Sequence, residues 1–313
     1  MIRVGFIGAG FVSGIHRRVL AGDDRVEVTA VHDADPARRG PLGAASVDDL
    51  LERCDAVYIT CPNTLHREMA LRAIEAGKHV FCEKPMATTV EDARAIANAA
   101  AAASTVFQVG HNRRFAKVYK RLKEMLAERP PHTAHIKMNR GELLQPAWTG
   151  DDTITGGFLF ETPIHLFDMV RFQFGEVVSV EARESRKNDF SILFELAGGM
   201  FATFVTSADA SWFFPFERME VFGEYSTIET AEMESIQYRL SPYEPTQMEH
   251  FSGLSLDEKW GFVEGDRRFI DAVTSGGEAP VTAMDGLRSV ELCQAIYQSA
   301  RERRRVEFPE VKA

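Results

Sequence analysis

The fold is decided by the stretch IRVGFIGAGFVS, residues 2–13. Its first six residues form an apolar run typical of a buried strand, and a helical pattern begins at Phe11. Between them, Gly8 permits a tight turn and Gly10 lets the backbone approach a pyrophosphate, while the small Ser13 replaces the third glycine of the usual fingerprint. The helix N-terminus offers unpaired N–H groups and a partial positive charge to phosphate. The stretch therefore predicts a dinucleotide-binding Rossmann domain.

The next hundred residues continue to alternate short apolar runs with helical patterns. The expected helices are Phe11–Ala21, Leu65–Ala76 and Val90–Ala103, and the further strands are Val26–Val31, Ala56–Thr60, His79–Cys82 and Thr105–Val109. Strands and helices alternating at this spacing predict βαβ units and a parallel sheet. Residues 35–47 are few for a crossover, so we expect a stunted helix there. We end this first domain at residue 116.

Residues 117–313 have a different texture and form the expected second domain. A helix over Phe115–Glu128 marks the boundary, and three more are expected over Pro163–Phe174, Asp257–Ser275 and Ala283–Arg303, the final one able to pack back on the first domain. The expected strands are Ala134–Gly141, Val177–Glu184, Ser191–Leu196, Met200–Thr206, Met219–Phe222 and Ser226–Thr230. Consecutive strands of this kind predict an antiparallel or mixed sheet.

Composition excludes several classes of protein. A net charge of −10 argues against nucleic-acid binding. No run of residues is long and apolar enough to span a membrane, and no secretory signal is visible. The four cysteines form no CxxC pair and indicate free thiols, so we expect a cytoplasmic protein. His132 and His135 have no carboxylate or cysteine at ligand spacing, so we expect no metal.

Asp33 follows the second strand, 23 residues beyond Gly10, where an acidic residue contacts the adenosine ribose of a bound dinucleotide. Its charge would repel the 2′-phosphate of NADP by about 4 kcal/mol at 4 Å and an effective dielectric of 20. We therefore expect NAD rather than NADP. Arg38 and Arg39 favour the opposite choice, because either could bind that phosphate. Alternatively, Asp33 caps a helix that starts near Pro36.

Four further motifs occur in order along the chain. They are Thr60-Cys61-Pro62-Asn63 with His66, then Glu83-Lys84-Pro85, then Gly156-Gly157 leading to His165 and Asp168, and finally Asp285 through Tyr297-Gln-Ser-Ala. Together they resemble the glucose–fructose oxidoreductase/inositol dehydrogenase/MocA family over nearly the whole chain. The resemblance implies a Rossmann domain followed by an α/β domain with a large, mostly antiparallel open sheet. It also implies hydride transfer between nicotinamide and a hydroxyl-bearing carbon of a sugar or cyclitol, and a homodimer or homotetramer formed through the open sheet face.

The resemblance also assigns catalytic residues. Lys84 would hydrogen-bond the reacting oxygen and stabilise its developing negative charge, and His165 would be the acid/base. Thr162 and Pro163 are typical of an N-cap and first helical residue, which would put His165 in the first turn. Alternatively, Lys84 is a solvated lysine at the end of a strand, and His165 is a histidine at a helix start that hydrogen-bonds to the backbone. The implied cofactor contacts are Gly8, Gly10, Phe11, Val12, Asp33, Thr60, Pro62, Asn63, His66, Glu83 and Lys84.

At the expected substrate contacts the sequence departs from the family pattern. The family has Asp four residues before the histidine, whereas this chain has Glu161, which keeps the charge and adds a methylene. Asp168 would orient His165 or pack beside it. Arg114, in the charged segment after the fifth strand, would face substrate or else link the domains. Trp148 would stack on a sugar ring or else pack in the protein.

Two other functions remain open at this point. The altered segment from Glu161 through Pro163 allows reduction of another substrate class, such as a dihydrodiol, an imine or a tetrapyrrole. A non-catalytic nicotinamide-binding sensor is the third possibility. A sensor would be expected to lack Lys84 or His165, and both are present, which favours an enzyme.

Overall fold

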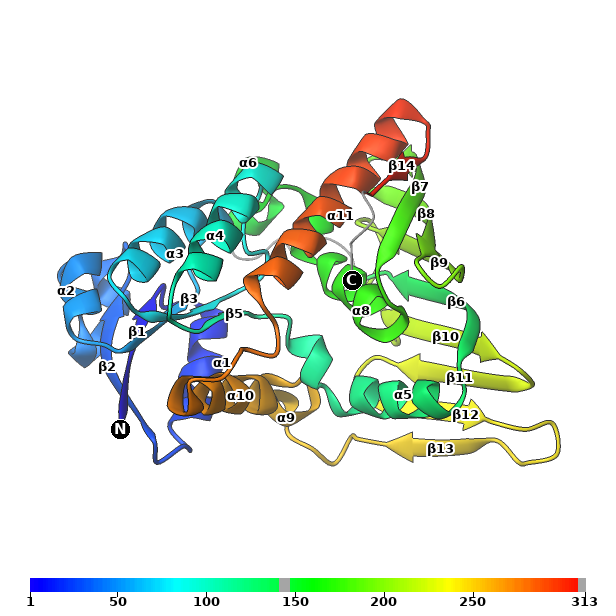
Figure 1. Ribbon diagram of the computed structural model, residues 1–313, viewed down its shortest axis with the longest axis horizontal. Coiled ribbons are helices and arrows are strands. Elements are labelled where there is room, and N and C mark those ends of the chain that lie inside the picture. The colour runs from blue at the N-terminus through cyan, green and yellow to red at the C-terminus, as the bar shows by residue number, and fades with distance from the viewer. Residues whose placement is uncertain (141–146, 309–313) are drawn as a thin grey trace. The chain divides into compact units, whose positions relative to one another are not determined.

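The computed structural model describes residues 1–140 and 147–308 (Figure 1). The α-helices are α1 Phe11–Leu20, α2 Val47–Glu52, α3 His66–Glu75, α4 Val90–Ala102, α5 Lys117–Glu128, α6 Asp152–Thr155, α7 Phe158–Glu161, α8 Ile164–Phe174, α9 Leu256–Lys259, α10 Phe262–Ser275 and α11 Ala283–Glu302. The strands are β1 Ile2–Ile7, β2 Val26–His32, β3 Ala56–Ile59, β4 His79–Cys82, β5 Phe107–Val109, β6 Pro131–Met138, β7 Val177–Arg186, β8 Asp189–Leu196, β9 Phe201–Ser207, β10 Glu217–Gly223, β11 Ser226–Ala231, β12 Ser235–Arg239, β13 Gln247–His250 and β14 Val306–Glu307.

Two compact units divide the described chain, and neither is continuous in sequence. The first contains Met1–His111, Thr153–Gly156 and Phe262–Val290, and the second contains Asn112–Asp152, Gly157–Gly261 and the rest of the chain from Glu291. The predicted division into 1–116 and 117–313 allowed only the final helix, from Ala283, to pack back on the first domain, whereas the first unit contains all of Phe262–Val290. α10 lies in this returning segment and packs against α1.

The first unit contains a parallel sheet with the strand order β2-β1-β3-β4-β5 among the described residues. This confirms the predicted parallel sheet. The chain leaves β1 for β2 on one side and then crosses to β3 on the other. The carboxyl ends of β1 and β3 therefore flank a switch point, where open α/β sheets bind ligands. Residues 36–42 form only two 3-10 turns, as the short crossover predicted.

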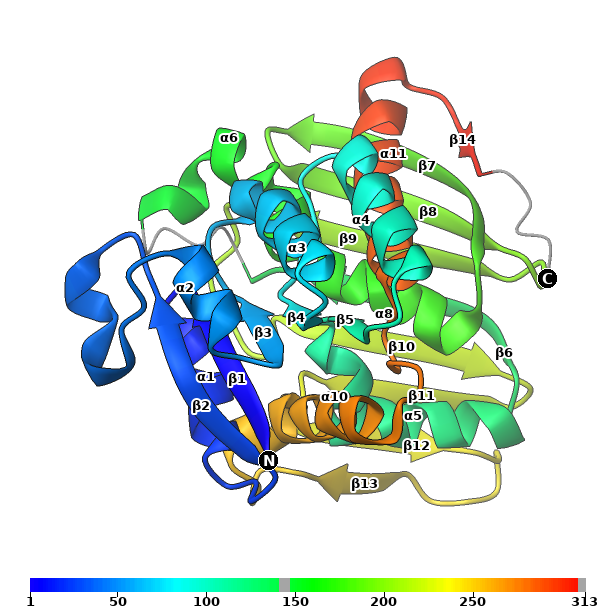
Figure 2. The ribbon, with the colours of Figure 1, turned by 60° about the vertical axis from the view of Figure 1, so that its left-hand side comes forward.

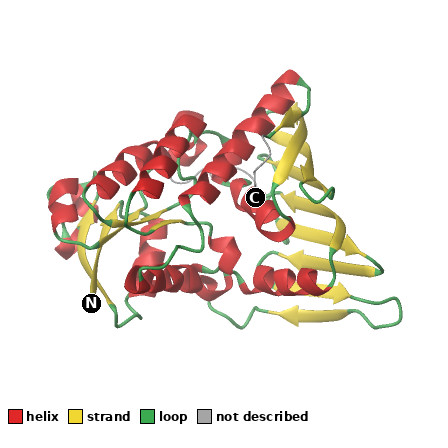
Figure 3. Ribbon diagram, in the orientation of Figure 1, coloured by secondary structure: helices red, strands yellow, loops and turns green. Residues whose placement is uncertain are grey.

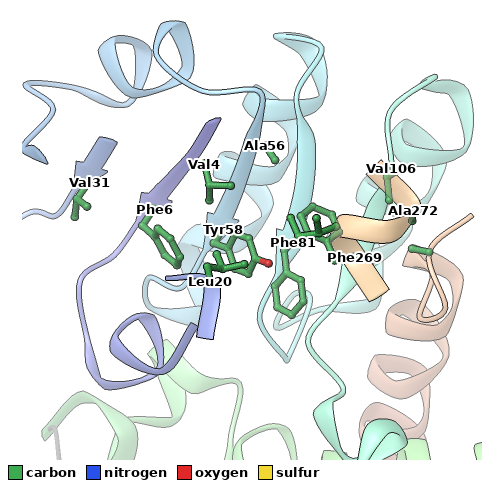
Figure 4. Close-up of a cluster of buried hydrophobic side chains, with 12 residues drawn as sticks. Val4, Phe6, Leu20, Val31, Ala56, Tyr58, Phe81, Val106, Phe269 and Ala272 are labelled. Carbon is green, nitrogen blue, oxygen red and sulfur yellow. The ribbon is translucent and has the colours of Figure 1, made fainter. Parts of the chain in front are cut away.

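Helices cover both faces of this parallel sheet. α3 and α4 lie side by side on one face, and α1 and α10 lie on the other (Figure 2). Beneath α1 and α10, aromatic rings stack in the core (Figure 4). Tyr58 lies between Phe6 and Phe81, with ring centroids 4.9 and 4.6 Å away, and Phe269 of α10 meets Tyr58 edge-on at 5.5 Å. The core thus fixes the returning helix onto the Rossmann sheet.

The second unit contains a sheet with the strand order β13-β12-β11-β10-β6-β9-β8-β7-β14 among the described residues. Its pairs are antiparallel except β6 with β9, which confirms the mostly antiparallel sheet. The sequence did not predict β12, β13 or β14. α5 and α8 lie on one face (Figure 3), and no described helix of this unit covers the other. That uncovered face is called the open face below.

Three predicted boundaries differ from the structure. The helix expected over Asp257–Ser275 is two helices, because Gly261 has φ +85° and a Cβ there would lie 2.3 Å from the Asn112 carbonyl oxygen. β6 runs from Pro131 to Met138, and Gly141, the predicted end, lies outside the described residues. α5 begins at Lys117 after a 3-10 turn over Asn112–Phe115. None of the described helices has the length and apolarity required to cross a bilayer.

Candidate functional site

The glycine turn after β1 has the geometry of a phosphate cradle. Gly8 has φ +98°, and a Cβ there would lie 2.7 Å from the backbone of Thr60 and Cys61, so only glycine fits between β1 and β3. A Cβ at Gly10 would meet nothing within 4 Å, so the backbone there borders open space. A dinucleotide pyrophosphate requires this combination of a tight turn and an accessible backbone.

The first turn of α1 is available to an anion. Its N-cap, Gly10, provides no side-chain hydrogen bond, and the turn contains no acidic residue. Phe11 is exposed, whereas Ser13 is fully buried, as the packing role of the third fingerprint position requires. The backbone N–H groups at this terminus have no intrahelical partner and would therefore suit a phosphate. The residues present fit a bound dinucleotide.

Asp33 lies beside this turn and is half-buried. Its Oδ2 accepts the Ala9 N–H at 2.8 Å and its Oδ1 accepts the Asp35 N–H at 2.9 Å, so the carboxylate is fixed next to the glycine turn. The two arginines that could favour NADP have other partners. The Arg39 guanidinium donates to the backbone oxygens of Asp33 and Ala44, and exposed Arg38 lies 3.5 Å from the Asp35 carboxylate.

The segment from Thr60 to His66 stabilises this end of the sheet through its side chains. Thr60 Oγ1 donates to the Gly8 carbonyl at 2.9 Å, and Asn63 Nδ2 donates to the Thr155 carbonyl at 3.1 Å. His66 is buried, with Nδ1 2.7 Å from the Pro85 carbonyl and Nε2 2.9 Å from the Cys61 carbonyl. His66 therefore connects this segment, which also contains Pro62, to the end of β4.

The segment Glu83-Lys84-Pro85 directly follows β4 and therefore lies at the carboxyl edge of the parallel sheet. The Glu83 side chain is buried, and its Oε1 lies 3.1 Å from His16 Nε2 of α1. Its Oε2 accepts the Lys84 N–H at 3.2 Å. A Cβ on Gly110 would lie 2.6 Å from Glu83 Oε1, so a side chain there would displace this carboxylate. Half-buried Lys84 is thus held between Glu83, contacted by His16, and Pro85, contacted by His66.

His16 also binds a second buried carboxylate. Its Nδ1 lies 2.7 Å from Asp266 Oδ1 on α10, and Tyr58 donates to the same oxygen at 3.3 Å. Burial opposes the imidazolium charge, but the attraction and hydrogen bonds of Asp266 and Glu83 outweigh it and raise the pKa of His16 to about 10. Burial opposes ionisation of Glu83 as well, but the His16 imidazolium keeps its pKa lowered. His16 is therefore a cation at neutral pH.

In the second unit, Gly157 leads into the four-residue helix α7, which is followed by α8. Gly157 has φ +105°, and a Cβ there would lie 2.7 Å from the Tyr297 hydroxyl, which accepts the Leu159 N–H at 3.1 Å. The prediction of Thr162 as N-cap is wrong. Thr162 is the C-cap of α7, and Pro163 is the N-cap of α8. α8 begins one residue later because α7, which the sequence did not reveal, occupies the residues before it.

Glu161 and His165 are brought to neighbouring helix ends. Glu161 is the last residue of α7, and His165 lies in the first turn of α8, as predicted. Their exposed fractions are only 8% and 7%, so both polar side chains are held inside the unit. Trp148 lies on a 3-10 turn over Ala147–Gly150 and is half-buried.

Asp168 and Arg114 form a buried, bidentate ion pair. Arg114 Nε and Nη2 donate to the two carboxylate oxygens at 2.8 and 2.6 Å. Bidentate geometry of this kind fixes both groups in orientation as well as charge. The pair joins the 3-10 turn after β5 to α8, so two of the residues expected at substrate lie together.

Sequence reasoning missed three polar groups. His16 lies six residues beyond Gly10, yet its partner Asp266 is 250 residues away, and no local pattern links them. Arg113, next to the predicted Arg114, is buried and donates to Glu217 at 3.0 Å. Arg140 packs among aromatic rings that include Trp212. The aromatic run over residues 212–216 was the available signal for that cluster.

Comparison with known proteins adds independent information. Residues 2–111 match a family model described as an oxidoreductase family, NAD-binding Rossmann fold, and residues 123–308 match the C-terminal α/β domain of the same family. The chain is 26% identical to inositol 2-dehydrogenase of Rhizobium meliloti over 330 residues, covering 97% of this chain and 98% of that one. It is 25% identical to myo-inositol 2-dehydrogenase of Thermotoga maritima, with 99% of each chain covered.

Solved structures share the fold. Levoglucosan dehydrogenase in complex with NADH superimposes with a TM-score of 0.89 at 20% identity, covering 99% of this chain and 100% of that one. GenD2 from gentamicin A biosynthesis, in complex with NAD, gives a TM-score of 0.85 at 23% identity, covering 99% and 97%. At these identities the likeness concerns the architecture of both units.

Proposed function

The chain belongs to the glucose–fructose oxidoreductase/inositol dehydrogenase/MocA oxidoreductase family, whose first domain binds NAD. On that premise we propose that it oxidises a hydroxyl-bearing carbon of a sugar or cyclitol with NAD, or reduces the corresponding carbonyl carbon with NADH. The observation that carries this proposal is the fixed Glu83-Lys84-Pro85 segment. A protein that only bound the dinucleotide would have no need to hold a lysine between two buried histidine contacts at the carboxyl edge of the NAD-binding sheet.

We assign roles to residues by their chemistry. Bound NAD supplies the hydride acceptor or donor. Lys84 donates a hydrogen bond to the reacting oxygen and stabilises the negative charge that develops on it. His165 moves the proton to or from that oxygen. Glu161 accepts a hydrogen bond from a neighbouring substrate hydroxyl.

The remaining predicted residues shape the substrate site. The Arg114–Asp168 ion pair fixes the turn after β5 against α8 and so supports His165. Trp148 supplies an aromatic face to a sugar ring. The backbone at Gly8 and Gly10 and the first turn with Phe11 and Val12 hold the pyrophosphate.

We assign the remaining cofactor contacts to residues near the same glycine turn. Asp33 binds the adenosine ribose, and the segment containing Thr60, Pro62, Asn63 and His66 borders the nicotinamide beside Glu83 and Lys84. Preference for NAD over NADP is supported by the Asp33 carboxylate and by the engagement of Arg39 with backbone oxygens.

We also propose that the protein is a cytoplasmic homodimer or homotetramer that pairs through the open face. Leu193, Phe201, Val205 and Phe222 project from neighbouring strands of that face and are 37–44% exposed. The described cysteines are all free, which suits a reducing compartment. Light scattering should give a multiple of 35.0 kDa, and Phe201→Glu with Val205→Glu should lower it. A monomer for the unaltered chain at micromolar concentration contradicts the pairing.

A panel of sugars, sugar acids, sugar phosphates and cyclitols tests the activity. NADH formation is followed with each compound, and NAD binding is measured separately by calorimetry. Turnover of at least one polyol supports the proposal. Tight NAD binding without turnover on the whole panel contradicts it and favours a sensor, whereas turnover only with an imine or a dihydrodiol favours the other reductases.

A further inference from the structure

Arg140 lies two residues beyond β6 and carries its guanidinium into a cluster of aromatic rings. The guanidinium carbon lies 4.2 Å from the ring centroid of Trp212, 5.4 Å from that of Phe216 and 5.6 Å from that of Trp260. All four residues belong to the second unit. Aromatic faces at these distances attract a cation and hold its plane in a defined orientation.

This guanidinium has no carboxylate counter-ion in the described part of the chain. Its Nε is buried without a hydrogen-bond partner there, and no ion pair or hydrogen bond involves its terminal nitrogens. Two other buried arginines of the same unit differ from Arg140 in this respect. Arg113 is paired with buried Glu217 at 3.0 Å, and Arg114 with buried Asp168 at 2.6 Å.

The surroundings make this cation costly without a ligand. Burial and the repulsion of Arg113 lower the pKa of Arg140 to about 10, which still leaves it charged at neutral pH. The nearest carboxylates only influence it from beyond ion-pair distance. Glu217 is engaged by Arg113 and Tyr119, and Glu232 accepts the Phe216 N–H. A desolvated cation of this kind is stabilised by an anion brought to it.

Arg140 belongs to the same unit as Glu161, a proposed substrate contact. The Glu161 carboxylate is among the charges that act on Arg140, and Glu161 ends the helix that precedes His165. Trp212 is 52% exposed, so one part of the aromatic cluster faces solvent and can meet a ligand. A ligand bound there would contact a negative charge at Glu161 and a positive charge at Arg140. Its hydroxyl groups could donate to Glu161, and an anionic group could accept from Arg140.

We propose that Arg140 binds an anionic group on the substrate, so that the enzyme acts on a sugar or cyclitol carrying a carboxylate or a phosphate. The inference rests on the proposed function and adds the substrate class to it. The guanidinium fork matches a carboxylate or phosphate through two parallel hydrogen bonds. Its ring contacts hold the fork in place before the ligand arrives, which reduces the ordering entropy of binding.

Matched probes test the proposal. Glucose is compared with glucuronate and glucose 6-phosphate, and myo-inositol with inositol 1-phosphate, so the panel separates carboxylate from phosphate. We expect kcat/KM to be at least about tenfold higher for one anionic probe than for its neutral counterpart. Arg140→Met should lower kcat/KM for that probe about 10- to 100-fold, the range for a lost hydrogen bond to a charged group, and leave the neutral sugar nearly unchanged.

Two further variants keep the result decisive. Arg140→Lys should retain part of the preference, because it keeps the charge but not the fork, and Arg301→Met, at an exposed site, should behave like the unaltered enzyme. If none of these probes is turned over, the wider panel decides the proposed function, and calorimetry of the same probes on the NADH-loaded protein decides the inference. It is overturned if neutral and anionic probes react or bind equally, or if Arg140→Met loses both alike.

Discussion

His16 Nε2 lies 3.1 Å from Glu83 Oε1, and the other oxygen of this carboxylate accepts the backbone N–H of Lys84. The same imidazole holds Asp266 at 2.7 Å on its other side. One buried cation therefore joins the helix of the phosphate cradle, the end of β4 and the returning helix α10. This arrangement makes His16 a positioning residue, because it acts on Lys84 only through Glu83.

Replacing His16 should therefore damage both stability and catalysis. His16→Gln leaves two buried carboxylates without their cation, a change that costs about 3–5 kcal/mol when one partner of a buried pair is lost. Adding Asp266→Asn should recover part of this free energy of unfolding. Urea denaturation measures the stability, and kcat should fall more than the affinity for NADH. Stability equal to that of the unaltered chain would disprove the charged bridge.

The bridge also predicts how stability depends on pH. The pKa of His16 rises from 6.5 to about 10 on folding, so its contribution is complete below about pH 6.5 and disappears as pH rises through about 10. Asp266, Glu83 and Tyr58 are the titratable groups that contact it. The unfolding free energy should decline over that range, and His16→Gln should flatten the decline. Exposed His132→Gln is the control and should leave the slope unchanged.

Cofactor choice should depend on Asp33. Asp33→Ser removes the charge that opposes a 2′-phosphate, and it should reduce the ratio of kcat/KM for NAD to that for NADP by at least about tenfold, well inside the 4 kcal/mol repulsion estimated for two charges at 4 Å. Some activity with NAD should also be lost, because Asp33 accepts the Ala9 N–H. An unaltered enzyme that prefers NADP would refute the assignment.

A second buried pair should stabilise the second unit. Arg113 donates to Glu217, whose other oxygen accepts the Tyr119 hydroxyl at 2.7 Å. Arg113→Met alone should lower the free energy of unfolding by about 3–5 kcal/mol, and the double variant with Glu217→Gln should lower it less. Thermal unfolding compares the two variants. Equal losses in single and double variants would show that the charges are not coupled.

Local patterns were sufficient to predict much of the fold. The strand, glycine turn and helix over residues 2–20 follow from periodicity and turn chemistry, and the parallel order follows from alternation of strands with helices. Consecutive strand-like runs separated by turn signals located most strands of the larger sheet. β12 and β13 were missed because their residues are largely polar, and their pairing depends on β11 rather than on their own pattern.

The site was only partly predictable for a related reason. Motifs identified Glu83, Lys84 and His165 because their signals are local. The groups that hold them are distant, since His16 contacts Asp266 across 250 residues and Arg114 contacts Asp168 across 54. Tertiary contacts between residues so far apart produce no recognisable spacing pattern in the sequence. The predicted start of α8 was one residue too early for a local reason, because Thr162 is the C-cap of α7.

In the proposed mechanism, His165 transfers the proton and Lys84 stabilises the developing negative charge while hydride passes to NAD. Single-turnover NADH formation, with the best substrate carrying deuterium at the reacting carbon, tests it most directly. We predict a primary isotope effect, a rate lowered about 10²- to 10⁴-fold in Lys84→Ala and in His165→Ala, and nearly unchanged NADH affinity in both. Unaltered single-turnover rates in either variant, with the isotope effect intact, would contradict the claim.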